Sequence, residues 1–303
     1  MRQERPLHRQ TLAQTKEHWA YTFLAIPVLF YLVIRMFPSL FAFYLSMTDW
    51  DIISTEMHFI GFSNFKRMFQ DKVFWKTFTN TIKYVVFGLP CSLLLGFILA
   101  YNINKLTKGE DFFKSVYFLP YITSMVAVSW VWRWFFQPAP IGVFNNILSF
   151  FELPNHQFLQ SPNEAPFAIL APTVWADVGF QMLIFLAGMK GIPKHYYEAA
   201  SIDGAGNWIM LRSITIPLLR DTIVFLLITG TIRYLRIFTQ VLNMTYQGDG
   251  GPLNATKPLV LFIYQHAFNQ FEMGYASAMT VFLFLFILLI TMIQLKVTKN
   301  ENS

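Results

Sequence analysis

The chain has 303 residues, of which 54% are hydrophobic, 18% aromatic and only 13% charged. Soluble domains carry about 25% charged residues, so much of the surface of this protein must face lipid rather than water. The composition also excludes a disordered chain and a collagen, and a single cysteine, Cys91, excludes an intramolecular disulfide scaffold.

Six apolar stretches are long enough to cross a bilayer, whose hydrocarbon core of about 30 Å takes about 20 helical residues. They cover residues 19–43, 81–103, 113–136, 166–189, 215–242 and 273–295. The first follows a basic segment, but it is too long for a signal peptide and lacks a small-residue cleavage site, so we expect an uncleaved span. The sequence therefore predicts an all-α membrane protein with one six-helix domain, residues 19–296, between tails at 1–18 and 297–303.

The segment between the first two spans, residues 63–84, predicts an amphipathic helix at the outer membrane interface. Its apolar side chains lie along one side. They are Phe65, Met68, Phe69, Phe74, Trp75 and Phe78.

The 23 Lys and Arg residues predict the orientation in the membrane. With an even number of spans both termini share one side, where the segments carry 13 of these residues, against six on the opposite side and four within spans. Because cytoplasmic loops are enriched in Lys and Arg, we expect both termini in the cytoplasm. The net charge of +6 is scattered without the basic face that phosphates require, so no nucleic-acid partner is expected.

No motif for catalysis or nucleotide binding occurs in the sequence. A G-x-x-x-x-G-K-[ST] loop, an H-E-x-x-H pair and a G-x-S-x-G turn are all absent, and the six histidines are isolated. We therefore expect no catalytic residue, no metal and no cofactor. The energy for any transport must come from another subunit or from an ion gradient.

The loop between the fourth and fifth spans, residues 190–214, predicts two short helices. Pro193 can start the first, which Asp203, Gly204 and Gly206 end, and the second begins near Asn207. On these grounds alone, a plain connecting loop with a glycine turn fits equally well.

The spacing within this loop closely resembles the E-A-A loop of permease subunits in binding-protein-dependent ABC importers, above all the sugar branch with the maltose and glycerol-phosphate permeases. The matching residues are Glu198, Ala199, Ala200, Asp203, Gly204, Ala205, Gly206 and Pro217. Supporting matches extend over most of the chain, at 80–81, 118–120, 132–134, 178–180, 250–252 and 275–279.

The resemblance implies a type I ABC importer permease fold with a cytoplasmic coupling helix and no enzymatic activity of its own, since partner subunits bind ATP. In that family the loop docks into a cleft on an ATPase, so Glu198 is expected to pair with a basic group there. The implied partners are a second permease in a heterodimer, two cytoplasmic ATPase subunits, an extracellular or periplasmic solute-binding protein, a sugar substrate and the lipid of a bacterial cell membrane.

Ionisable residues at membrane depth are costly and mark candidate sites. Arg233 lies 13 residues beyond Arg220, about 20 Å into the bilayer at about 1.5 Å per residue, and Arg236 shares its helix face. We expect this pair to bind the carboxylate of an acidic saccharide, such as a uronic-acid-containing oligosaccharide. Further residues expected along the substrate path are Tyr234, Phe238, Gln240, Asp177 and Arg133.

Structural explanations of these charges remain open. Arg35 and Arg133 can snorkel to the outer interface, and Asp177 can neutralise one arginine. A second function class also stays open, namely a stand-alone secondary transporter or channel for a polar or anionic solute. It predicts inverted repeats, and we find no matching Gly or Pro interruptions in the two halves of the chain.

Overall fold

The computed structural model describes residues 12–54 and 56–300, and in this part the regular secondary structure is helical, with turns and loops between the helices and one isolated bridge between Thr48 and Phe59. The predicted all-α class is confirmed. The tail predicted at 1–18 lies partly outside the described residues, and so do the last three residues of the tail predicted at 297–303.

Four continuous helical segments are long and apolar enough to cross a membrane: Trp19–Leu45, Lys72–Ile103, Ala165–Lys190 and Met273–Val297. A fifth candidate is the pair α6 (Glu110–Ile122) and α7 (Met125–Phe135), which is bent by 92°. The third predicted span, 113–136, is therefore not straight, because Thr123 and Ser124 between the two helices are extended.

The fifth predicted span, 215–242, is divided into shorter helices. These are α12 (Ile216–Leu218), α13 (Arg220–Leu235) and α14 (Thr239–Met244). With 16 residues, α13 is shorter than the roughly 20 that a straight span needs. The structure thus contains four or five spans by length and composition, and α13 completes the bundle as a shorter helix.

Three of the four π-helical turns in the described residues are closely followed by a proline. Each proline is the second residue after the end of its turn. Pro38 follows the turn Leu32–Met36, Pro90 follows Tyr84–Gly88, and Pro217 follows Leu211–Thr215. Because proline lacks an N–H and its ring crowds the preceding turn, the extra residue of a π-turn lets the helix continue past it. The joined helices are α1 (Leu12–Tyr31) with α2 (Phe37–Leu45), α4 (Lys72–Lys83) with α5 (Leu89–Ile103), and α11 (Asn207–Met210) with α12.

The remaining helices complete the described chain. They are α3 (Ser63–Gln70), α8 (Val143–Phe150), α9 (Ala165–Lys190), α10 (His195–Ile202), α15 (Leu259–Tyr264) with a π-turn at Gln265–Asn269, and α16 (Met273–Asn300). Short 3₁₀ turns occur at Phe158–Gln160, Tyr246–Gly248 and Pro252–Asn254.

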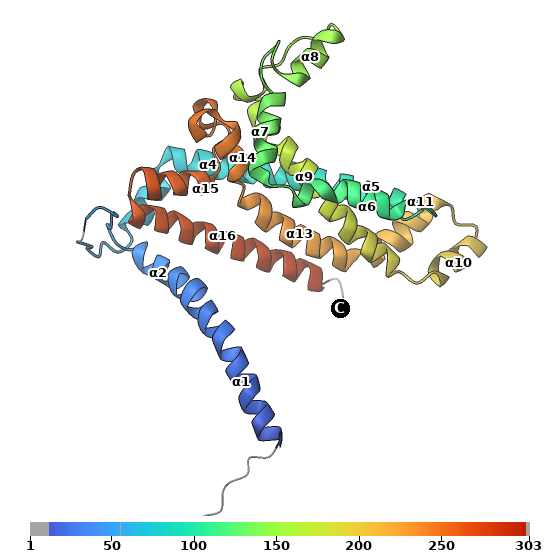
Figure 1. Ribbon diagram of the computed structural model, residues 1–303, viewed down its shortest axis with the longest axis horizontal. Coiled ribbons are helices and arrows are strands. Elements are labelled where there is room, and N and C mark those ends of the chain that lie inside the picture. Colours follow the sequence, from blue (N-terminus) through green and yellow to red (C-terminus); the bar gives the residue numbers. More distant parts are fainter. Residues whose placement is uncertain (1–11, 55, 301–303) are drawn as a thin grey trace, which may run out of the picture.

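The body of the molecule is a bundle in which α5, α9, α13 and α16 run alongside one another, with α10 and α11 at one end (Figure 1). The helices α5 and α9 pack closely, and Gln181 Nε2 donates a buried hydrogen bond to Ser92 Oγ at 2.8 Å. The α1–α2 segment instead diverges from the bundle (Figure 1), and none of the residues in its most apolar 18-residue window is buried.

The segment 63–84 differs from its prediction as an interfacial helix. It forms α3 and α4, and the side chains of Met68 and Phe74 are fully buried in a cluster with Leu259 and Met279. The apolar side therefore packs on α15 and α16 rather than resting mainly on lipid. Trp75 stays half exposed.

Candidate functional site: the loop at α10 and a buried ion pair

The loop after α9 forms the two short helices that its sequence predicts, α10 and α11. Helix α10 ends in a Schellman arrangement, in which Ala205 N–H donates to the Ala200 carbonyl at 2.9 Å and Gly204 N–H to the Ser201 carbonyl at 3.1 Å. Gly204 has a φ of +77°, which glycine adopts at low cost. The turn therefore depends on Gly204 and reverses the chain sharply.

The outer side of α10 is free to meet a partner. Glu198 and Ala199 are exposed, as are Asp203 and Gly206 beyond the helix, and Pro217 is exposed at the start of α12. Ala200 and Ala205 are partly covered. The loop thus exposes the acidic side chains of Glu198 and Asp203 and the short one of Ala199 beside large apolar side chains such as Ile202 and Trp208.

The inner side of α10 is attached to the bundle through Tyr197. Its hydroxyl lies 3.0 Å from Thr215 Oγ1, and its ring packs on a buried cluster that includes Met189, Ile192 and Leu219. The loop is therefore held against the ends of the two helices that it connects, α9 and α13.

Asp177 on α9 and Arg233 on α13 form an ion pair inside the bundle. Arg233 Nη2 lies 2.8 Å from Asp177 Oδ1, and the side chains are 38% and 3% exposed, respectively. The approach is too oblique for a directed hydrogen bond, so the contact is mainly electrostatic. Because an isolated buried carboxylate costs several kcal/mol, Arg233 serves first to neutralise Asp177.

A cavity of about 170 Å³ lies beside this pair, between α6, α9 and α13. The Arg233 guanidinium sits 4.8 Å from the centre of the Tyr121 ring, and that ring stacks on Phe180 with 4.8 Å between centroids. The other lining residues are Asp177, Gln181, Leu226, Thr229 and Gly230. The cavity is smaller than ligand pockets of about 300–1,000 Å³, so a saccharide would fit there only after the helices separate.

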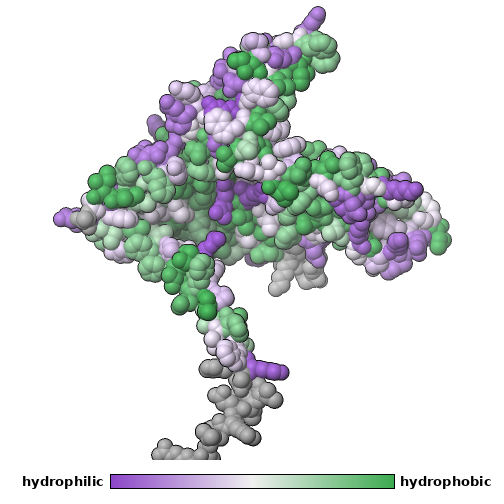
Figure 2. Space-filling view, in the orientation of Figure 1, coloured by the Kyte–Doolittle hydropathy of each residue, from purple (hydrophilic) through white to green (hydrophobic). Residues whose placement is uncertain are grey.

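Arg236 occupies a different position from Arg233. It follows the end of α13, where its N–H donates to the Arg233 carbonyl at 3.1 Å, and its side chain is exposed and makes no ion pair with the described residues. The two guanidinium groups therefore differ in their surroundings, since Arg233 is paired with Asp177 whereas Arg236 is exposed. Figure 2 shows a hydrophilic patch near the place where α13 gives way to α14.

The other residues expected along the path differ in access. Tyr234 is fully buried and Gln240 is 7% exposed, so both belong to the packed interior. Phe238 is partly exposed, and its ring lies 5.2 Å from that of Tyr264. Arg133 is partly buried, and its Nη1 donates to the Asn243 carbonyl at 3.2 Å. It thereby links α7 to the last turn of α14.

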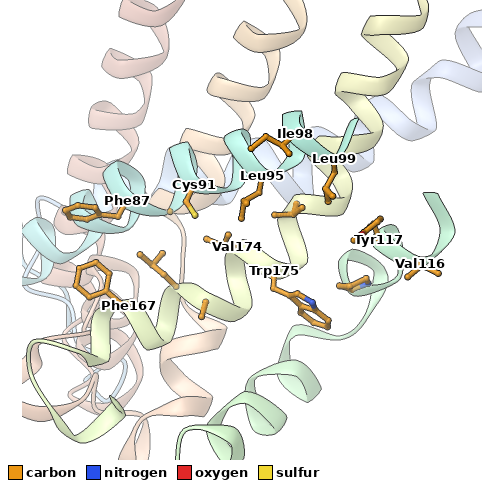
Figure 3. Close-up of a pocket in the computed structure, with 15 residues that line it drawn as sticks. Phe87, Cys91, Leu95, Ile98, Leu99, Val116, Tyr117, Phe167, Val174 and Trp175 are labelled. Carbon is orange, nitrogen blue, oxygen red and sulfur yellow. The ribbon is translucent and has the colours of Figure 1, made fainter. Parts of the chain in front are cut away.

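A larger cavity, about 720 Å³, is apolar and lies elsewhere, between α5, α6 and α9. Figure 3 shows Phe87, Leu95 and Leu99 along one side and Phe167, Val174 and Trp175 along the other. It offers none of the charged groups that the α6–α9–α13 cavity has, and it suits a lipid chain or an apolar helix better than a saccharide.

Sequence reasoning did not find Tyr121 and Phe180, because single aromatic residues in apolar spans have no pattern of their own. It also missed a cluster on the opposite side from α10, in which Arg67 donates two hydrogen bonds to the Glu272 carboxylate at 3.0 and 2.9 Å. Glu272 accepts a third contact from His266 Nδ1 at 2.8 Å. The sequence separation of 205 residues explains why no local signal pointed to it.

The described residues contain no group of three His, Cys, Asp or Glu side chains that could hold a metal ion.

Comparison with known proteins identifies the family. Residues 92–300 match the family described as "Binding-protein-dependent transport system inner membrane component". The chain is 35% identical to the probable ABC transporter permease protein YesP of Bacillus subtilis, over 98% of this chain and 93% of the relative. It is 30% identical to the multiple sugar-binding transport system permease protein MsmF of Streptococcus mutans, over 94% of this chain and 96% of the relative.

The fold is also similar to a solved structure. A chain in the crystal structure of a bacterial ABC transporter involved in the import of the acidic polysaccharide alginate superposes with a TM-score of 0.81 at 24% identity, covering 95% of this chain and 98% of that one. The stand-alone transporter or channel loses its support, since the matching family works with binding proteins. The chain belongs to the family of inner membrane components of binding-protein-dependent transport systems.

Proposed function

We propose that this protein is the permease subunit of an ATP-driven importer in a bacterial cell membrane, with both termini cytoplasmic, and that it carries a sugar or oligosaccharide. The observation that carries the proposal is the loop at α10, whose exposed acidic surface and tight glycine turn match the E-A-A spacing. The relative MsmF is named for multiple sugar-binding transport, which supports sugar as the substrate class. ATP would be bound by partner subunits, so the permease itself has no cofactor and no catalytic residue.

Two cytoplasmic ATPase subunits are the partners proposed for the α10 surface. Glu198 supplies a negative charge for a basic group in the partner, and Ala199 beside it leaves room for the partner's backbone. Because Tyr197 fixes the inner side of the loop to the bundle, a force applied to α10 reaches α9 and α13 directly.

A second permease, forming a heterodimer, is supported by the α1–α2 segment. Apart from the contact of α2 with α16, for example between the rings of Phe43 and Phe284, its apolar residues are exposed, and none is buried in its most apolar window (Figure 1). The cavity beside Asp177 is lined by α6, α9 and α13 of this one chain. A second permease would supply the other wall of a complete pathway. An external solute-binding protein would deliver the sugar, as in the solved alginate transporter in complex with a pentasaccharide-bound periplasmic protein.

An acidic saccharide remains the proposed cargo, with a changed role for the two arginines. Arg236 is the exposed cation that can bind a carboxylate, whereas Arg233 is already neutralised by Asp177. Phe238, partly exposed nearby, can stack on a sugar ring.

Co-purification tests the importer assignment. We expect the wild-type chain to retain a soluble ATPase in detergent, and Glu198→Ala to lose it while inserting normally into the membrane. Glu152→Ala is the matched control, because Glu152 is an equally exposed acid far from α10 in the sequence. Retention of the ATPase by Glu198→Ala, with unchanged uptake, would remove the basis for the coupling assignment.

Uptake assays test the cargo. Arg236→Gln should reduce uptake of a uronic-acid oligosaccharide much more than uptake of a neutral one, and Arg236→Lys should retain part of it because the charge remains. An equal defect for both substrates would assign Arg236 a structural role.

A further inference from the structure

Glu110 joins two helices at the α10 end of the bundle. It is the first residue of α6, and its carboxylate forms ion pairs with Lys114 one turn along the same helix and with Lys190, the last residue of α9. The Glu110 side chain is 24% exposed and that of Lys190 48%. Lys190 directly precedes the loop that carries α10, so this carboxylate connects α6 to the base of that loop.

The same two helices touch closely at a second place, where α9 has Gly179. A Cβ built on Gly179 would lie 1.9 Å from the carbonyl oxygen of Tyr117 on α6, so a glycine is required for this approach. Tyr117 lies seven residues beyond Glu110, or about 10 Å along the helix. The contact at Gly179 fixes the position of α6 at Tyr117, and the ion pair of Glu110, about 10 Å away along the helix, fixes the tilt of α6 relative to α9.

The tilt of α6 determines the wall of the cavity. Tyr121 follows Tyr117 by one turn, and its ring lies between Phe180 of α9 and the Arg233 guanidinium of α13. A rotation of α6 about the Gly179 contact therefore moves the Tyr121 ring in the direction opposite to Glu110.

The three walls of the cavity differ in how they reach the α10 loop. Helix α9 runs straight into it, and α13 follows it through α11 and α12, so the main chain moves both. Helix α6 comes earlier in the chain and is separated from the loop by α7, α8 and α9. Its link at this end of the bundle is the carboxylate of Glu110.

We propose that the Glu110–Lys190 ion pair transmits movement of the α10 loop to α6, and through α6 to Tyr121 at the cavity. Glu110 is thus a positioning residue, which couples the third wall of the pathway to the same ATP-driven step as the other two. The inference rests on the proposed ATP-driven import. The transmission role accounts for two features of these helices. They share an ion pair at the ends nearest the α10 loop, and they approach each other closely at Gly179.

A purely stabilising ion pair gives a different expectation. Partly exposed pairs contribute about 0–1 kcal/mol to stability, so removal of one would scarcely change assembly and would leave the response to ATP intact. The transmission role instead predicts normal assembly and a selective loss of movement in α6.

Thiol labelling measures movement of each wall separately. The full complex, purified with its partner subunits and reconstituted in liposomes, carries Cys91→Ser to remove the one native cysteine. A single reporter is then placed either at Thr123→Cys, just beyond α6, or at Thr229→Cys, on α13 in the cavity wall. The rate of reaction with a water-soluble maleimide is compared with and without ATP, so the unidentified sugar is not needed.

We expect ATP to change the labelling rate at both reporters in the otherwise native complex. Glu110→Gln should reduce the ATP-dependent change at Thr123→Cys by at least about fivefold, the lower end of typical coupling between sites, and leave the change at Thr229→Cys. Asp111→Asn is the matched control, because Asp111 neighbours Glu110 and contacts Lys114 at 3.2 Å but has a 97% exposed side chain on the far side of that lysine. The exchange of charges, Glu110→Lys with Lys190→Glu, should restore the response.

The results separate the two proposals. A full response at Thr123→Cys in Glu110→Gln overturns the transmission role and leaves the importer assignment standing. Loss of the response at both reporters in Glu110→Gln, without rescue by the charge exchange, also overturns it, since the ion pair would then be structural. An absence of any ATP response in the native complex overturns the proposed function itself.

Discussion

Replacement of Gly179 by alanine tests the close contact between α6 and α9. The added Cβ would lie 1.9 Å from the carbonyl oxygen of Tyr117, whereas an ordinary contact begins at 3.4 Å. The two helices must therefore separate by the difference of 1.5 Å at this point, because a backbone oxygen in a helix cannot turn aside as a side chain does. Overpacking of this kind costs about 1–3 kcal/mol.

A second effect opposes this cost, because alanine is a better helix former than glycine by about 1 kcal/mol. We therefore expect Gly179→Ala to destabilise the protein by up to about 2 kcal/mol overall and Gly179→Val by more. The assay is thermal unfolding of the purified complex in detergent, followed by tryptophan fluorescence. Gly206→Ala is the control, since a Cβ there meets no atom within 4 Å.

The sign of the effect decides the test. If Gly179→Ala is more stable than the wild type, or if Gly179→Val is no less stable than it, the helices are not in the contact described here. The contact at Gly179 could then not be the point about which α6 rotates.

The cluster of Arg67, His266 and Glu272 predicts a dependence on pH. Burial lowers the pKa of His266, and burial raises the pKa of Glu272 but is outweighed by the hydrogen bonds from Arg67 and His266, which hold it below its usual value. Both groups bind protons more readily in the unfolded chain, so acid favours unfolding. The free energy of unfolding should be constant near neutral pH, fall below about pH 6.5 through His266, and fall again below about pH 4.3 through Glu272. An unfolding temperature that rises on acidification would contradict this. Asn80→Ala should destabilise the loop after α14, because the buried Asn80 amide donates to two of its carbonyl oxygens at 2.7 and 3.1 Å and the loss of each leaves an unsatisfied group worth about 1–3 kcal/mol. Limited chymotrypsin digestion after the exposed Leu253 would report it, and an unchanged digestion pattern would count against the role of Asn80.

The loop at α10 was predictable because its structure is local. Gly204 must adopt a positive φ, Pro217 marks the start of the next helix, and the residues between them make backbone hydrogen bonds to neighbours within five positions. A turn of this kind is determined by the residue types at a few neighbouring positions, so the sequence alone predicts it. The exposure of Glu198 follows from the same turn.

The positions of the two arginines were not predictable in the same way. The sequence predicts a helix through residue 242, but α13 ends at Leu235 and α14 begins at Thr239, so Arg236 lies at the end of α13 rather than inside a helix. The break is held by contacts between α14 and α7, among them the hydrogen bond from Arg133. Contacts of this kind, over 110 residues, have no signature in a local window.

The segment 63–84 illustrates a further limit on what a membrane sequence reveals. Its apolar face is correctly predicted, but lipid and protein interior are about equally apolar, so the hydrophobic pattern does not say which of the two it meets. The burial of Met68 and Phe74 against α16 follows from the path of the chain.

The arrangement of charge along α13 bears on how an acidic cargo could be released. An unpaired arginine binds a carboxylate strongly in a low-dielectric pathway, and two of them in sequence would hold the cargo rather than pass it on. Here the cation at the end of α13, Arg236, is exposed, while the deeper one, Arg233, is paired with Asp177 at 2.8 Å. Attraction for an anion is therefore confined to the outer part of the path. Since α9 and α13 both connect to the α10 loop, a movement of that loop that separated Asp177 from Arg233 would expose the second cation only during the transport step.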